Sequence, residues 1–132
     1  MLVFNYLVMK TNRILYFLFL LLFYPAYVFS SVHINEIMVK NISKHINENF
    51  NFEGWVELYN SGNEPIELSN YFFSNDRDNS YLWQYEGNMT IQPHGFAVFY
   101  FDELDTLNHT NFKLDSDGGC LYLSDSEGAV VD

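Results

Sequence analysis

The clearest pattern in the chain is strict alternation of residue type over residues 54–60, Gly-Trp-Val-Glu-Leu-Tyr-Asn. Alternation with a period of two predicts a β-strand that carries its aromatic residues and Glu57 on one face, and Val56 and Leu58 on the other. The turn-forming run Asn-Ser-Gly-Asn at 60–63 ends it. We interpret this stretch as a central strand of a small β-sandwich.

Short runs of the same kind recur along residues 31–132, and no stretch has a sustained helical period. About eight short strands at a spacing of roughly 8–12 residues predict an all-β antiparallel sandwich. The Asn-rich residues 40–52 have no period and predict a loop. The expected strands are 32–39, 54–60, 66–68, 71–73, 81–85, 96–101, 112–114 and 120–123, with the last pairing with 129–131 across a turn at 126–128.

Three local features refine this pattern. Asn35 and Glu36 interrupt the alternation of the first strand and predict either a bulge or a polar contact with a neighbouring strand. The sequence Gln-Pro-His-Gly at 92–95 suits a type I turn. Residues 96–101, Phe-Ala-Val-Phe-Tyr-Phe, are apolar on both faces, which predicts a strand in the interior of its sheet.

The first thirty residues predict an export signal. Lys10 and Arg13 precede the apolar run 14–24, Pro25 breaks it, and small residues before Ser31 suit a cleavage site after Ser30. A retained membrane anchor is the alternative, but an eleven-residue helix of roughly 16 Å reaches only about half-way across a bilayer. We expect a signal helix over 1–30, with a possible true start at Met9, and a secreted or cell-surface domain over 31–132.

Composition narrows the classes of partner. Aromatic residues make up 19% of the chain, in keeping with an all-β fold. The net charge is −11, and all seventeen acidic residues but only four of the six basic ones lie in residues 31–132, which therefore carry −13. Four lysine and arginine residues are too few for tight binding to a phosphate backbone, so we expect no nucleic-acid partner. We expect contact with a membrane only through the signal segment, during export.

Polar residues inside the predicted strands are the first candidate site. Glu36, Glu57 and Asn60 can converge if the first two strands are neighbours, and would then form a metal or acid–base site. The alternative is a polar network, including Asn35, that only fixes the pairing of the strands, and we favour it. We expect no catalytic residue and no cofactor.

Acidic loops are the second candidate. Asp76 and Asp78 resemble half a calcium loop, as do Asp115 and Asp117 before two glycines, but neither has the full ligand spacing of an EF-hand. We interpret these acids, and a third patch at 102–105, as solvated loop residues with at most a weak calcium site. A glycan-binding surface built on Tyr81, Trp83 and Tyr85 is a further alternative.

The remaining reactive side chains predict no chemistry. The four histidines have no paired metal spacing, so we interpret them as surface residues. Cys120 lies on a predicted strand and is expected to be a small buried hydrophobe. A lone reactive thiol, or one that pairs between chains, is the alternative. The histidines are His33, His45, His94 and His109.

Taken in order, several of these stretches resemble the lamin tail domain family. The resemblance implies an immunoglobulin-like β-sandwich, and secreted bacterial members resemble non-catalytic accessory modules of surface proteins, hydrolases or nucleases. Family members usually continue for another strand or two past 131–132, so this copy looks C-terminally incomplete. The stretches that carry the resemblance are 34–37, 55–60, 66–71, 91–96, 111–114, 118–119 and 121–125.

The expected function is therefore a secreted, non-enzymatic module that contacts a protein partner or the neighbouring domains of a larger chain. A calcium- or glycan-binding module is one alternative. An amino-terminal accessory domain of a secreted hydrolase or nuclease is the other.

Overall fold

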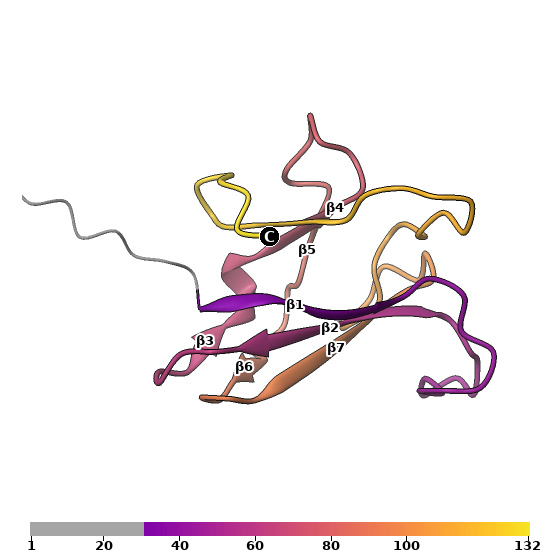
Figure 1. Ribbon diagram of the computed structural model, residues 1–132, viewed down its shortest axis with the longest axis horizontal. Coiled ribbons are helices and arrows are strands. Elements are labelled where there is room, and N and C mark those ends of the chain that lie inside the picture. The colour runs from indigo at the N-terminus through magenta and orange to yellow at the C-terminus, as the bar shows by residue number, and fades with distance from the viewer. Residues whose placement is uncertain (1–30) are drawn as a thin grey trace, which may run out of the picture.

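The computed structural model describes residues 31–132, and Figure 1 shows them as two facing layers of strands. The predicted signal helix and its cleavage point fall on residues 1–30 and lie outside the described residues. Within the described part, no helix is long and apolar enough to cross a membrane. The elements are β1 (Val32–Met38), β2 (Gly54–Asn60), β3 (Ile66–Glu67), η1 (Leu68–Asn70), β4 (Phe72–Ser74), β5 (Trp83–Gln84), β6 (Thr90–Ile91), β7 (Phe96–Phe101) and β8 (Tyr122–Ser124).

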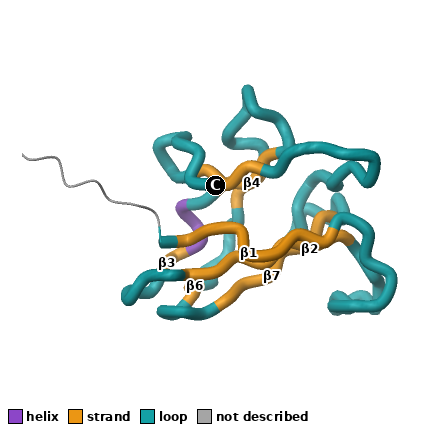
Figure 2. The backbone as a smooth tube through the Cα atoms, viewed as in Figure 1, coloured by secondary structure: helices purple, strands orange, loops and turns teal. Residues whose placement is uncertain are grey.

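The predicted all-β class is confirmed. One layer is the three-stranded sheet β1-β2-β7, and the other is β5-β4-β8. A two-stranded sheet, β3-β6, lies at the end of the sandwich where β1 begins (Figure 1). Every paired strand is antiparallel, and the single-turn 3-10 helix η1 is the only helix that the structure describes (Figure 2).

The core forms because β2 alternates as its sequence predicts. Val56 and Leu58 are fully buried between the layers, and β2 is the central strand of its sheet, as expected. Phe73 of β4 packs edge-on against Phe99 and Phe101 of β7, with ring centroids 5.1 and 5.8 Å apart, and so joins the two layers. Each large apolar side chain buried in this way stabilises the fold by about 1.5–3 kcal/mol.

The interruption predicted in the first strand is a β-bulge. The register of β1 against β2 shifts between Ile34 and Glu36, so two residues of β1 face Glu57. The amide of Asn35 donates a hydrogen bond to the carboxylate of Glu57 at 2.8 Å. Both forms of the expectation, a bulge and a cross-strand polar contact, are therefore present.

Several predicted strands differ from the structure. The strand predicted over 81–85 is limited to 83–84, the one predicted over 120–123 spans 122–124, and β6 was not predicted. Residues 112–114 form a loop, although Phe112 is buried in the core and Leu114 packs against it. The strand predicted over 66–68 ends at Glu67, and Leu68 begins η1. The hairpin at the end of the chain is present in short form, through an antiparallel bridge between Ser124 and Val130.

Strand β7 lies at an edge of its sheet and not in the interior as predicted. It tolerates apolar residues on both faces because the loop after it turns back along its open side. The backbone N–H of Tyr100 donates to the carbonyl of Asn108, and the N–H of Thr110 donates to the carbonyl of Tyr100, both at 2.8 Å. This loop therefore protects the sheet edge that a further strand would otherwise cover.

The turn at 92–95 is not of type I. Gly95 does donate its N–H to the carbonyl of Gln92 at 2.8 Å, as a β-turn requires. However, His94 has a φ of 58°, and a positive φ at the third position belongs to a type II turn.

Candidate functional site

The outer face of β2 carries a second small core. Trp55 and Tyr100 are register partners on β2 and β7, and both are buried although they point away from the main core. Two loops, 40–53 and 102–111, cover them. The ring of His45 packs edge-on against Trp55, with centroids 4.6 Å apart, and His109 stacks on Tyr100 at 5.2 Å.

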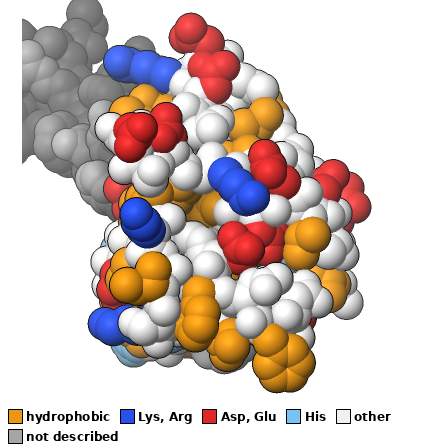
Figure 3. Space-filling view, turned by 90° about the vertical axis from the view of Figure 1, so that its right-hand side faces the viewer, with side chains coloured by type: hydrophobic (Ala, Val, Ile, Leu, Met, Phe, Trp, Pro, Cys, Tyr) orange, Lys and Arg blue, Asp and Glu red, His pale blue; other side chains and the backbone are white. Residues whose placement is uncertain are grey.

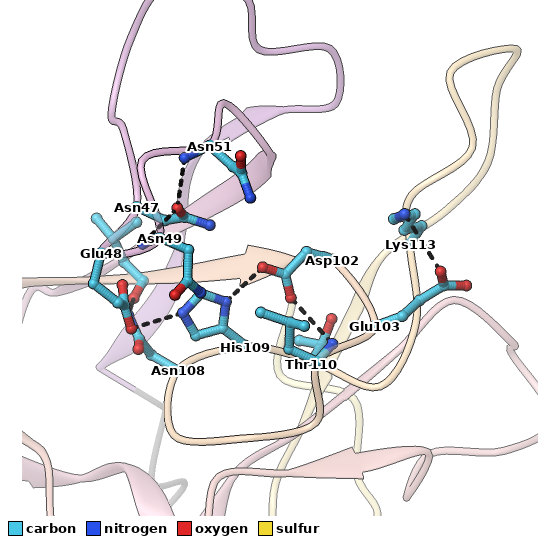
Figure 4. A network of polar contacts seen from close by, with 12 residues as sticks. Asn47, Glu48, Asn49, Asn51, Asp102, Glu103, Asn108, His109, Thr110 and Lys113 are labelled. Atoms are coloured by element: carbon cyan, nitrogen blue, oxygen red, sulfur yellow. Dashed lines mark hydrogen bonds and ion pairs between the residues drawn. The ribbon is translucent and has the colours of Figure 1, made fainter.

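A buried histidine links these two loops (Figure 4). The Nδ1 atom of His109 lies 2.6 Å from Asp102 Oδ2, and its Nε2 atom lies 2.8 Å from Glu48 Oε1. The side chains of His109 and Asp102 are only 1% and 3% exposed, whereas Glu48 is 54% exposed. A carboxylate can only accept a hydrogen bond, so these two contacts assign a proton to each ring nitrogen and make His109 an imidazolium ion. We call this set, Glu48–His109–Asp102, the latch.

The electrostatics of the latch support this protonation state. Burial opposes a charge on His109, but the hydrogen bonds to Asp102 and Glu48 outweigh it and raise the pKa of His109 above 6.5. A backbone hydrogen bond and the bond from His109 lower the pKa of Glu48 below 4.5. Burial, and then the charge of Glu48, raise the pKa of Tyr100 above 10.0.

Asparagine side chains shape the loop that the latch holds. Asn41 Oδ1 accepts hydrogen bonds from the backbone N–H groups of Ser43 and Lys44 at 3.3 and 2.9 Å. Asn47 Oδ1 accepts from those of Asn49 and Asn51 at 3.1 and 2.9 Å. Asparagine side chains mimic backbone turns in this way, so the Asn-rich composition of the segment has a structural cause.

The same loop presents apolar side chains to solvent. Ile42 is 77% exposed and Phe50 is 81% exposed, while Ile46 and Phe52 are about half exposed. The loop lies at the end of the sandwich that faces the viewer in Figure 3, where hydrophobic side chains gather along the lower part of the surface. Several exposed apolar side chains on one loop of fixed shape are typical of an interaction site. We call residues 40–53 the apolar loop.

The latch is poorly suited to catalysis. Both ring nitrogens of His109 are used as donors, so the ring has no lone pair with which to take a proton from a substrate. The hydroxyl of the adjacent Thr110 is buried and donates to the carbonyl of Phe112 at 2.7 Å. Among residues 31–132, no group of three or more His, Cys, Asp or Glu side chains is placed to hold a metal ion.

The polar residues proposed from the sequence do not converge on one site. Asn35 and Glu57 pair on the exposed face of the β1-β2 ladder, and Glu36 beside them is exposed. Asn60 lies at the far end of β2 and is fully buried. Asn60 therefore takes no part in the contact between Asn35 and Glu57.

Asn60 fastens two segments, 62–64 and 91–92, to the end of β2. Its amide nitrogen donates to the carbonyls of Glu64, Ile91 and Gln92 at 2.8, 3.1 and 3.3 Å. Its side-chain oxygen accepts the N–H of Gly62 at 2.9 Å. These contacts account for a buried asparagine without any ligand.

The calcium candidates form short local turns. Asp76 Oδ1 accepts the N–H of Asp78 at 3.0 Å, and Asp115 Oδ1 accepts the N–H of Asp117 at 2.9 Å. These hydrogen bonds are of the Asx-turn type, so the two acidic loops owe their shape to self-contained hydrogen bonding.

Four sequence-based interpretations are wrong. His109 is buried and not a surface residue, and Asp102 is not a solvated loop acid, because each neutralises the other. Cys120 is exposed rather than buried, since β8 begins only at residue 122. The three aromatic residues at 81–85 do not form a binding surface, because Trp83 and Tyr85 belong to the core and only Tyr81 is exposed.

Comparison with known proteins agrees with the sandwich and its ordered motifs. The family model described as Lamin Tail Domain matches residues 25–132. No curated protein and no solved structure shows significant similarity to the chain. Because the match covers most of the chain, this protein belongs to the lamin tail domain family.

Proposed function

We propose that this protein is a non-enzymatic, secreted or cell-surface module that binds a protein partner through the apolar loop. The observation that carries the proposal is the contrast within that loop. Glu48 bonds to His109 in the neighbouring loop and Asn47 is buried and bonds to the backbone of the loop itself, whereas Ile42 and Phe50 are largely exposed to solvent. A loop that only closed the fold would be expected to bury its largest apolar side chains.

The loop has the properties of a binding loop on a rigid scaffold. Fixing its shape before binding lowers the entropy cost of association. An exposed aromatic residue such as Phe50 is of the kind that often supplies much of the energy in protein interfaces. The predicted export signal supports a role outside the cytoplasm, and the family supports an accessory role beside a catalytic or surface-anchored domain.

The test uses purified protein as bait for the secreted and surface proteins of the producing cells. Each captured protein is then titrated against the wild type and two variants. Ile42→Ser/Phe50→Ser removes the exposed anchors, and Phe96→Ser removes an exposed aromatic side chain at the opposite end of the sandwich.

We expect the loop variant to weaken binding by about tenfold or more and Phe96→Ser to leave it unchanged. A captured partner that binds the loop variant as tightly as the wild type would contradict the proposal. Failure of the wild type to bind any secreted or surface protein specifically would contradict it too.

A further inference from the structure

Three stretches of the chain have the acceptor pattern for an N-linked sugar, which is asparagine, any residue except proline, and then serine or threonine. Their asparagines are Asn41, Asn88 and Asn108. A pattern this short arises by chance in a chain rich in asparagine, so it does not by itself identify a modified residue. The structure separates the three, because a linked sugar is bulky and belongs on the surface of a folded protein.

Asn41 is held inside the apolar loop. Its side chain is only 7% exposed, and its Nδ2 atom donates to the carbonyl of His45 at 3.2 Å. Its Oδ1 atom accepts the backbone N–H groups of Ser43 and Lys44. A sugar on this nitrogen would displace the turn that the side chain builds, so Asn41 is not an acceptor in the folded protein.

Asn108 belongs to the loop that protects β7. Its Nδ2 atom donates to the carbonyl of Val98 at 3.3 Å. Thr110, which completes its acceptor pattern, is fully buried, and its hydroxyl donates to the carbonyl of Phe112 at 2.7 Å. A transferase therefore has no access to this pattern as a whole while the loop is folded.

Asn88 is placed differently. It is exposed, in the irregular segment 85–89 that connects β5 with β6, and Thr90 begins β6. Within residues 31–132, no hydrogen bond engages the side chain of Asn88 or the hydroxyl of Thr90. Both residues line a hollow of about 220 Å³. The amide of Asn88 is therefore free and has open space beside it.

The sequence before Asn88 has a further feature that the other two patterns lack. Glu86, two residues earlier, is exposed, whereas Val39 and Thr106 occupy the corresponding positions before Asn41 and Asn108. An acid at this position offers a charge to a basic group of a transferase, and bacterial oligosaccharyl transferases select acceptors that have one.

The position of Asn88 also suits a bulky group. The segment 85–89 leads into β6, which lies at the end of the sandwich where β1 begins (Figure 1). The apolar loop follows the other end of β1. A sugar on Asn88 therefore leaves the apolar loop uncovered.

We propose that Asn88, alone among the three asparagines, is an acceptor of an N-linked oligosaccharide. The donor is an oligosaccharide carried on a lipid pyrophosphate. The Nδ2 atom of Asn88 forms a bond to the anomeric carbon as the bond from that carbon to the pyrophosphate oxygen breaks. The lipid pyrophosphate leaves with the electron pair, and the amide nitrogen gives one proton to a base of the transferase. Use of the site in the cell rests on the export assumed in the proposed function, but the apolar loop takes no part in it.

The test incubates the full protein, purified and folded, with a purified bacterial oligosaccharyl transferase and its lipid-linked donor. Mass spectrometry of the intact protein and of its peptides counts and locates the sugar. The assay needs neither export nor a protein partner, so its failure is distinguishable from failure of the proposed function. Asn88→Gln removes the acceptor, and Glu86→Gln removes the acid. The double variant Asn88→Gln/Thr106→Glu gives Asn108 the acid that it lacks.

We expect one oligosaccharide per wild-type chain, located at Asn88, and none in Asn88→Gln. The initial rate should be lower by about tenfold or more in Glu86→Gln, because one charged contact with the transferase is lost. The double variant should stay unmodified when folded, whereas a synthetic peptide of its residues 104–112 should be modified at Asn108. Wild-type protein that stays unmodified would overturn the proposal. So would modification of Asn108 in the folded double variant.

Discussion

His109 and Glu48 are sixty-one residues apart in the chain, yet their side chains meet at 2.8 Å over the outer face of the sheet. This contact ties the long loop between β1 and β2 to the loop that protects β7 (Figure 4). Asp102, on the other side of the ring, is buried with it. The shape of the apolar loop therefore depends on a charged pair held in a small secondary core.

The two carboxylates of the latch should differ greatly in their effect on stability. Asp102→Asn leaves a buried imidazolium without its counter-charge and should lower the free energy of unfolding by about 3–5 kcal/mol. Glu48→Ala removes a partner that is largely exposed and should cost about 1 kcal/mol or less. Urea unfolding of both variants measures this, and equal losses would contradict the assigned burial.

The contribution of the latch should depend on pH. The raised pKa of His109 means that its contribution is complete below pH 6.5 and is lost as the pH rises through the folded value. The lowered pKa of Glu48 means that its contribution is complete above pH 4.5 and is lost as the pH falls through the folded value. The latch should therefore stabilise the protein most between these two values.

The measurement is the difference in unfolding free energy between the wild type and His109→Gln at several pH values. The difference should be largest at about pH 5.5 and should shrink as the pH rises above 6.5. A difference that does not change with pH would show that the pKa of His109 is the same in the folded and unfolded protein, and a difference that grows as the pH rises would show that His109 is neutral when folded.

Asn60 should be far more important for stability than Asn35, although both were grouped in one network from the sequence. Asn60→Ala leaves three carbonyls and one N–H without their partner in a buried place and should cost at least about 2 kcal/mol. Asn35→Ala removes one exposed contact and should cost less than about 1 kcal/mol. Thermal unfolding compares them, and a similar loss for both would contradict the separate roles.

Cys120 should react with thiol reagents in the folded protein. Its side chain is exposed in the segment before β8, so a disulfide reagent should label it without denaturant. Cys120→Ser should change the free energy of unfolding by no more than about 0.5 kcal/mol. If labelling required urea, Cys120 would be buried, as the sequence predicts, and the exposed position would be contradicted.

Much of the fold follows from local sequence patterns. The alternation around Val56 and Leu58 predicts the central strand, and the polar pair Asn35-Glu36 predicts the bulge. In each case the signal lies within a few residues of the feature that it predicts. The edge position of β7 was missed because its cover comes from a loop, which leaves the strand apolar on both faces.

The candidate site is formed by contacts that no local sequence pattern predicts. A histidine seven residues after an aspartate has no distinctive spacing, and Glu48 joins them only because β1 and β2 pair. The 43% exposure of Ile37 is likewise not predicted by local sequence, because it depends on the segments that pack around β1. The Asn-rich loop did carry a local signal, since asparagine side chains build its turns.

Hydrogen exchange of the apolar loop, in the wild type and in Glu48→Ala, tests most directly the claim that the latch holds this loop in shape. The account predicts that the amides of Asn49 and Asn51, which bond to Asn47, exchange faster in the variant, while those of β2 are unchanged. Identical exchange in the two proteins would contradict it.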